Sequence, residues 1–329
     1  MSGGDDSGAR RNPATDVGPD AAARPVTAGE SAPRARIAGE PAGPGPDPAA
    51  FLSGEAGNVG GRRMAARRGA LDLACRAAAI AARHGARLDR LAATQAPRSV
   101  LVLGVYRPGS LLPATAAQLR SARHTVAFAL GATGATADPA IAAETALAGL
   151  DGGKFQNLDA LLAATPATDR DWTVIVDDDV VLPPRFLDRA IALCERLGLD
   201  LAQPAQTARS HAAWRVVRQR PLALARETAF VEIGPVTLIG RRAAAELTPF
   251  PPLRFGWGLD SHWGALARER GWRLGVLDAL AVRHDTRQVA VTYPRDAATA
   301  EARAFLAERP FLTAAEAQRT FATHWRAPA

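Results

Sequence analysis

The chain has 329 residues, of which 47% are hydrophobic and 5% aromatic, enough to bury the core of one large domain. Its 2 cysteines are too few for a disulfide framework or a thiolate zinc cluster, which excludes a disulfide-stapled scaffold and favours a reducing compartment. No run approaches the roughly 18 apolar residues of a membrane span. The N-terminus MSGGDDSGAR has no apolar signal-peptide core, so we expect a cytoplasmic protein.

The formal net charge of +7 suggests nucleic-acid binding, because basic surfaces bind phosphate backbones. Nearly all basic residues are arginines, with Lys154 as the single lysine, and they are scattered along the chain. They are not interleaved with the aromatic residues that base stacking requires. We therefore attribute the charge to an arginine-rich composition and do not expect nucleic acid as a partner.

The first 62 residues are rich in Gly, Ala, Pro, Asp and Ser and show no sustained apolar period, which predicts a disordered tail. Residues 63–97 have a helical pattern and predict a helix or a helix pair. The arginines of this segment form either a solvated basic face or a surface that touches anionic lipid headgroups. Peripheral contact with the inner face of the membrane therefore stays open as an alternative.

From Ser99 onward, runs typical of strands alternate with helical ones. We expect strands at 99–106, 124–133, 172–176, 231–240 and 274–284, and helices at 113–122, 155–164 and 186–197. This order predicts the α/β class, with a mostly parallel central sheet flanked by helices. The catalytic domain is expected at 98–295, and residues 296–329 are expected to form a C-terminal helical extension.

The cluster Asp177–Asp179 directly follows the apolar strand expected at 172–176. Three adjacent carboxylates repel one another unless a cation neutralises them, and open α/β sheets bind ligands at the carboxyl ends of their strands. Hard oxygen ligands at this place suit Mg²⁺ or Mn²⁺. The alternative is a solvated acidic turn that starts the next helix at Pro183 or Pro184, where carboxylates favour the helix dipole.

An apolar strand followed by Asp-x-Asp-Val also resembles the nucleophile motif of haloacid-dehalogenase-like phosphatases. Such a phosphatase needs a lysine downstream of the nucleophile to hold the phosphate charge, and a later acidic pair for Mg²⁺. Lys154 lies upstream of the aspartates and is the only lysine in the sequence. We therefore do not expect this class of phosphatase.

A second cluster, FGWGLDSHW at 255–263, is followed by ALAVRHD at 279–285. The glycines on both sides of Trp257 would let backbone and indole approach a ligand closely, and Asp260 falls at the start of a helix. Asp260 is there either an exposed acid on a rigid element or the N-cap of that helix. His284 ends an apolar strand, as either a nitrogen ligand of the metal or a satisfied core histidine.

These segments occur in a recognisable order: SVLVLGVYRP, GGKFQNLDALL, VIVDDDVVLP, EIGPVTLIGRR, GWGLD and VRHD. The set resembles a glycosyltransferase of the family 2 type, with a GT-A, Rossmann-like fold, over residues 98–295. The GWG-x-D element followed by an arginine-histidine pair is similar to the β-1,4-galactosyltransferase-like branch.

The resemblance implies a role for each matching acid and histidine. Asp177 and Asp179 match the D-x-D pair that binds a divalent metal, Mn²⁺ or Mg²⁺, and through it the diphosphate of a nucleotide sugar. Asp178 is the intervening position and is counted with the donor site. His284 matches a third metal ligand.

Other matching positions are expected to contact the donor nucleotide. Gly104, Val105 and Tyr106 match the loop after the first strand, which in the family lies against the nucleotide base. Lys154 and Asn157 stand in the segment before the D-x-D strand, where the family often contacts the donor. A lone lysine in an arginine-rich chain fits a selective role, because the two side chains are not interchangeable.

Asp260 matches the acid of the GWG-x-D element, which is the expected general base. The commonest form of the element has a second acid beside it, whereas Leu259 and Ser261 flank Asp260 here. Asp285 and Glu232 are the next acids to consider as the base.

The resemblance thus implies a metal-dependent, inverting glycosyltransferase. It would move a sugar from a nucleotide-sugar donor to a hydroxyl of a saccharide or another acceptor. One alternative is a nucleotidyltransferase on a related sheet, for which GVYRPGS supplies only a thin phosphate-binding loop. Another is a GT-A-like domain that binds saccharide or nucleotide without turnover.

Overall fold

The computed structural model describes residues 47, 50, 62–165, 170–284 and 294–327. The part of the chain from Pro46 to Ala329 forms one compact unit, which contains the three regions predicted at 63–97, 98–295 and 296–329. The predicted tail at 1–62 lies outside the described residues except for three of its positions.

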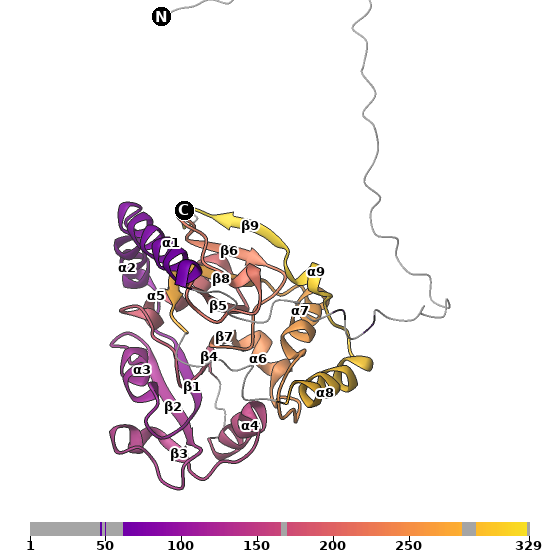
Figure 1. Cartoon of the computed structure of the whole chain (residues 1–329). Coiled ribbons are helices and arrows are strands. Elements are labelled where there is room, and N and C mark those ends of the chain that lie inside the picture. Colours follow the sequence, from indigo (N-terminus) through magenta and orange to yellow (C-terminus); the bar gives the residue numbers. More distant parts are fainter. Residues whose placement is uncertain (1–46, 48–49, 51–61, 166–169, 285–293, 328–329) are drawn as a thin grey trace, which may run out of the picture. The chain divides into compact units, whose positions relative to one another are not determined.

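A single sheet of nine strands runs through the described chain in the order β3-β2-β1-β4-β7-β5-β8-β6-β9 (Figure 1). β6 and β7 run antiparallel to both of their neighbours, and the other strands share one direction. The α/β class with a mostly parallel sheet is thereby confirmed. The strands are β1 (Ser99–Tyr106), β2 (Thr125–Ala132), β3 (Thr145–Leu147), β4 (Trp172–Val176), β5 (Leu201–Gln206), β6 (Ala225–Thr228), β7 (Val236–Gly240), β8 (Leu274–Val282) and β9 (Thr320–His324).

Helices cover both faces of the sheet. Along β1, Val100 and Val102 face a core that α2, α3 and α5 complete, while Leu101 and Leu103 face a core completed by α4, α6, α7 and α8. This alternation explains why the strand reads as a continuous apolar run. The helices are α1 (Arg62–Ala81), α2 (His84–Thr94), α3 (Leu112–Leu119), α4 (Lys154–Ala164), α5 (Phe186–Leu197), α6 (Arg241–Leu247), α7 (Leu259–Arg270), α8 (Arg295–Ala307) and α9 (Ala314–Ala317).

Several segments differ from the sequence-based expectation. The extension expected to be helical at 296–329 contains, besides α8 and α9, the strand β9, which pairs with β6 at the edge of the sheet. β3 and β6 were not expected as strands either. The strand predicted at 231–240 is wrong in its first half, because only β7 is extended in the sheet. Pro235 has no amide N–H to donate, and the N–H of Glu232 is taken by the side chain of Gln203. β5, with sequence LAQPAQ, was not predicted as a strand, because a proline and two polar glutamines are untypical of a buried strand. All of its residues are nevertheless buried.

α5 shows that the aspartate cluster does not start a helix. The helix begins at Phe186, after the residue Arg185 in left-handed conformation, and ends at Gly198, as its apolar spacing predicts. Asp177–Asp179 therefore lie outside its first turn, where the helix dipole acts. The interpretation of the cluster as a helix-starting turn is wrong.

α1 carries four exposed apolar side chains, but they do not form one stripe. Met64 and Leu71 are one heptad apart, as are Leu73 and Ile80. At about 100° per residue, the two pairs point to opposite sides of the helix. Among the described helices, none has the length and apolarity needed to cross a bilayer. Contact of this segment with a membrane surface stays a prediction.

Candidate active site

The aspartate cluster lies at the carboxyl end of β4, as predicted. The backbone N–H of Asp177 donates to the carbonyl of Pro235 (2.8 Å), and the carbonyl of Asp178 accepts from Leu111 N (2.8 Å). The cluster is therefore fixed between the loop after β1 and the turn before β7.

Asp177 pairs with the only lysine of the chain. Lys154 Nζ lies 2.6 Å from Asp177 Oδ1 and donates to the carbonyl of Ile233 (2.7 Å). Gly234 leaves room for this pair, because a Cβ there would lie 2.7 Å from Asp177 Oδ2 and 3.1 Å from Lys154 Nζ. The structure thus brings the predicted donor-binding lysine to the predicted metal-binding acid.

Asp178 is bound by an arginine that the sequence did not single out. Arg107 donates from Nη2 to Asp178 Oδ1 (2.6 Å) and from Nε to Oδ2 (2.9 Å), and its backbone N–H adds a bond to Oδ2 (3.0 Å). A bidentate pair of this kind fixes geometry as well as charge. Asp178 therefore holds the loop after β1 against the cluster.

Asp179 and His284 lie together and are both buried. His284 Nε2 is 2.9 Å from Asp179 Oδ1, yet the two are not aligned as a hydrogen bond, and His284 Nδ1 has no hydrogen-bond partner in the described part of the chain. Burial would raise the pKa of Asp179, but the contact with His284 outweighs it and lowers the pKa. For His284, burial lowers the pKa, but the nearby carboxylates outweigh that and raise it.

The residues predicted to bind a metal fit one in part. Asp179 Oδ1 and His284 Nε2 lie 2.9 Å apart, and this nitrogen has no hydrogen-bond partner among the described residues, so the pair offers one oxygen and one nitrogen ligand. Asp177 would join them only by leaving Lys154. Correspondingly, the described residues contain no group of three His, Cys, Asp or Glu side chains already arranged to hold a metal ion.

A loop at 207–212 encloses His284. The backbone N–H of His284 donates to Ser210 Oγ (3.0 Å), and the N–H of His211 donates to the carbonyl of His284 (2.8 Å). The two imidazole rings are 6.4 Å apart, edge to face. Arg218 holds the loop by donating to four of its carbonyls. The sequence pattern did not predict this loop, because the contacts that bring it to His284 and Arg218 join residues far apart in the chain or involve backbone groups.

Glu232 is a buried acid beside this loop. Its carboxylate accepts hydrogen bonds from the N–H groups of Ala213 (3.1 Å) and Trp214 (3.0 Å) and from the side chain of Gln206. Burial raises the pKa of Glu232 to about 8, and the charge of Asp260 adds to the rise. Glu232 therefore lies within electrostatic reach of the predicted base.

Asp260 is the second residue of α7 and is partly buried. The N-cap of this helix is Gly258, at φ 85°, so the interpretation of Asp260 as the N-cap is wrong. Asp260 Oδ1 accepts from the N–H of Ser261 (2.9 Å). Burial raises the pKa of Asp260 to about 7, the range in which a carboxylate can accept a proton near neutral pH.

The glycines around Trp257 approach protein rather than a ligand. A Cβ at Gly256, where φ is +75°, would lie 2.7 Å from the ring of Phe155. A Cβ at Gly153 would lie 2.0 Å from the carbonyl oxygen of Arg254. The segment before Lys154 and the segment before α7 therefore interlock through their glycines, which fixes the two predicted functional regions relative to each other.

Tyr106 and Asn157, which were also predicted to contact the donor, make hydrogen bonds to other parts of the protein. Tyr106 is buried; its hydroxyl contacts Thr145 Oγ1 (2.8 Å) and accepts from Asp138 N (3.0 Å). The Asn157 side chain pairs with both backbone groups of Gly152 (2.9 and 3.1 Å).

The expectation that Gly104, Val105 and Tyr106 form the loop after the first strand is wrong, because all three lie on β1 itself. Gly104 packs closely against Val176 and Leu112, and Val105 packs against one of the two main cores. Asp285, the alternative base, lies outside the described residues.

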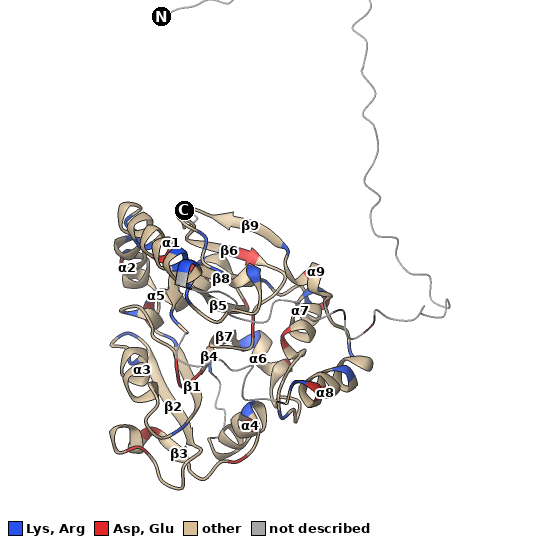
Figure 2. Ribbon diagram, in the orientation of Figure 1, with Lys and Arg blue, Asp and Glu red and all other residues tan. Residues whose placement is uncertain are grey.

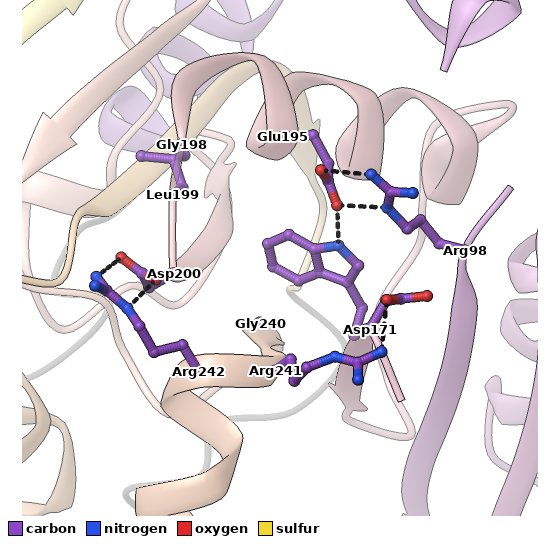
Figure 3. A pocket seen from close by; sticks show the side chains of 10 residues that line it. Arg98, Asp171, Glu195, Gly198, Leu199, Asp200, Gly240, Arg241 and Arg242 are labelled. Carbon is purple, nitrogen blue, oxygen red and sulfur yellow. Dashed lines mark hydrogen bonds and ion pairs between the residues drawn. The ribbon is translucent and has the colours of Figure 1, made fainter. Parts of the chain in front are cut away.

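A hollow of about 490 Å³ lies at the opposite end of β4, around Trp172 (Figure 3). Its charged side chains neutralise one another, as in the pairs Arg98–Glu195 and Arg242–Asp200. It is separate from the aspartate cluster and offers no unpaired acid or base for catalysis among the residues that line it.

Comparisons with solved structures gave several similar chains. The mannosyltransferase PcManGT from Pyrobaculum calidifontis, in complex with GDP-Man and Mn²⁺, is 17% identical, with 67% of this chain and 69% of that chain covered and a TM-score of 0.42. GalNAc-T7 with UDP, GalNAc and Mn²⁺ is 12% identical, with 57% and 44% covered and a TM-score of 0.41. S. aureus TarS 1–349 in complex with UDP-GlcNAc is 13% identical, with 60% and 61% covered and a TM-score of 0.39.

A search among curated proteins found no match. The family model described as "Glycosyltransferase like family 2" matches residues 73–297, which is more than half of the chain. That span includes the aspartate cluster, Lys154, Asp260 and His284. The chain belongs to the glycosyltransferase-like family 2.

Proposed function

We propose that the chain transfers a sugar from a nucleotide-sugar donor to an acceptor hydroxyl, with inversion at the anomeric carbon and with Mn²⁺ or Mg²⁺ as cofactor. The observation that carries the proposal is the placement of Asp260 at the start of α7, directly after the segment 254–256 that packs against Gly153 and Phe155. These two residues flank Lys154, which pairs with Asp177 of the aspartate cluster. Burial raises the pKa of Asp260 to about 7, which supports its assignment as the proton acceptor beside a cation-binding cluster.

Asp260 has the properties of the general base. An acceptor hydroxyl has too high a pKa to attack alone, so a carboxylate must take its proton as the new bond forms. The acceptor oxygen bonds to the anomeric carbon while the bond from that carbon to the diphosphate oxygen breaks. The bonding electrons leave with the diphosphate, and the proton passes to Asp260. A single displacement of this kind inverts the anomeric configuration.

The departing diphosphate gains negative charge, which the opposite side of the site can offset. Lys154 supplies a positive charge beside Asp177, and Arg107 supplies another beside Asp178. Asp179 and His284 would hold the divalent cation, with Asp177 joining once Lys154 turns to the diphosphate. The cation would supply Lewis-acid stabilisation of the leaving group.

Two finer assignments belong to the same proposal. The GWG-x-D element with the Arg283–His284 pair supports the β-1,4-galactosyltransferase-like branch. The two cysteines, Cys75 and Cys194, are free and buried, which supports a reducing, cytoplasmic setting.

The test is release of nucleoside diphosphate from a panel of UDP- and GDP-sugars, with Mn²⁺, with Mg²⁺ and with chelator. The proposal expects release that needs the metal and rises with a suitable acceptor. A nucleotidyltransferase would instead form or consume pyrophosphate. A domain that only binds would show a higher melting temperature with a nucleotide sugar but would release no nucleoside diphosphate. Pyrophosphate chemistry or binding without release would each contradict the proposal.

A further inference from the structure

The chain beyond the family-matched region touches the loop that leads to Asp260. The match ends at residue 297, within α8. Farther along α8, the Glu301 carboxylate accepts three backbone hydrogen bonds from the loop 254–256. They come from Arg254 N to Oε2 (2.7 Å), from Phe255 N to Oε1 (2.9 Å) and from Gly256 N to Oε1 (3.1 Å).

This carboxylate determines the path of the loop. The three N–H groups lie in the bend just before the turn that leads into α7, and the Glu301 carboxylate accepts a hydrogen bond from each of them. Hydrogen bonds from N–H groups to an ionised carboxylate are stronger than those to a neutral acceptor. The path they fix includes the positive φ of Gly256, which places this residue against Phe155 next to Lys154.

The same C-terminal segment also holds the start of α7 on both sides of Asp260. Leu306 packs against Gly258, where a Cβ would lie 2.9 Å from its Cδ1. The N–H of Leu312 donates to the carbonyl of Ser261 (3.1 Å), and the Ser261 hydroxyl donates to the carbonyl of Leu312. These contacts leave the Asp260 side chain itself free of the C-terminal segment.

We propose that Glu301 is a positioning residue for the transfer reaction: it fixes the loop 254–256 and thereby the orientation of Asp260. This rests on the proposed role of Asp260 as the base. A displacement of about 1 Å of a reacting group can cost about 10²-fold in rate. In this proposal the C-terminal extension contributes to catalysis by fixing the loop that precedes Asp260.

The first test measures the contact itself. Backbone hydrogen exchange of residues 254–262 is compared in the full-length protein, in Glu301→Ala and in Glu308→Ala. Glu308 is a matched control, because it is an exposed glutamate at the C-cap of the same helix. We expect exchange to be at least about tenfold faster in Glu301→Ala and unchanged in Glu308→Ala. Unchanged exchange in Glu301→Ala would overturn the proposal.

The second test measures its effect on catalysis. With UDP-GlcNAc or GDP-mannose, whichever is turned over, Glu301→Ala is expected to lower kcat about 10- to 100-fold with a smaller change in donor KM. Glu301→Gln keeps one acceptor oxygen and should recover part of the loss. Faster exchange with normal kcat would overturn the positioning role.

A double variant separates this proposal from the proposed function. If Glu301 acts through Asp260, Glu301→Ala in an Asp260→Asn background should cause little further loss. Full additivity of the two losses would overturn the proposal. If Asp260→Asn alone keeps normal turnover, the assignment of the base is wrong, whereas the exchange experiment still decides whether Glu301 holds the loop.

Discussion

The carboxylates on the two sides of the site differ in what surrounds them. On the proposed donor side, Asp177, Asp178 and Asp179 each face a cationic or protonatable side chain, and the pKa of Asp179 is lowered. On the proposed acceptor side, Asp260 and Glu232 have no ion pair among the described residues, and the pKa of each is raised.

The difference shows how one type of functional group can serve two purposes. Carboxylates that stay ionised suit the binding of cations, whereas a buried carboxylate with a raised pKa suits proton transfer. Figure 2 shows basic and acidic residues spread along many elements of the ribbon. The two groups of carboxylates therefore differ in their local pairing and not in the overall distribution of charge.

The largest expected effect is on the acceptor side. Asp260→Asn keeps the size of the side chain but cannot accept a proton, so kcat for transfer should fall by at least about 10²-fold. Folding and donor binding should persist, as measured by melting temperature and by calorimetry with a nucleoside diphosphate. Normal turnover in the folded variant would move the base to Glu232 or Asp285.

The next effect is on the donor side. Asp179→Ala should abolish measurable divalent-metal binding and weaken metal-dependent binding of nucleoside diphosphate by about tenfold or more, because a carboxylate ligand is lost. Titration calorimetry with Mn²⁺, alone and with UDP or GDP, checks this. Wild-type metal dependence in the variant would show that the cluster does not bind the metal.

His284→Ala should give a smaller, selective effect. Imidazole is a softer ligand than carboxylate and favours Mn²⁺ over Mg²⁺. The ratio of activities with the two metals should therefore shrink several-fold in the variant. An unchanged ratio of the activities with Mn²⁺ and Mg²⁺ would indicate that His284 is a buried core histidine and not a metal ligand. His262→Ala, a change at a histidine that contacts the carbonyl of Pro310, serves as the control.

The smallest effect is on stability. A carboxyl group whose pKa is higher in the folded state than in the unfolded state binds more protons when folded, so its contribution to stability falls as pH rises between about 4 and 7. Asp260→Asn removes this term. Its melting temperature relative to wild type should therefore increase by roughly 2–5 °C from pH 5 to pH 8. A difference that does not change with pH would contradict the raised pKa of Asp260.

The local sequence pattern was sufficient to predict the strand and helices that carry or flank the candidate site residues. The apolar run of β4 followed by Asp177, and the helical period of α5 ended by Gly198, occur where the sequence predicted them. The sequence also predicted that Asp260 starts a helix. These features depend on neighbours along the chain, which a single sequence displays.

Contacts between distant segments could not be predicted in the same way. Arg107 pairs with Asp178, and Glu301 accepts bonds from backbone N–H groups that carry no side-chain signature. The pairing of Lys154 with Asp177 likewise depends on Gly234, which reads in the sequence as part of a strand. Each of these contacts is decided by how separate elements pack.

The pH dependence of nucleoside diphosphate release by the wild-type protein and by Asp260→Asn tests the central claim most directly. A general base acts when it is deprotonated, so the wild-type rate should rise with pH through an apparent pKa near 7 and then level off. The variant should be slow and should lack this step. A wild-type profile without a step near 7, or the same step in the variant, would contradict the assignment of Asp260 as the base.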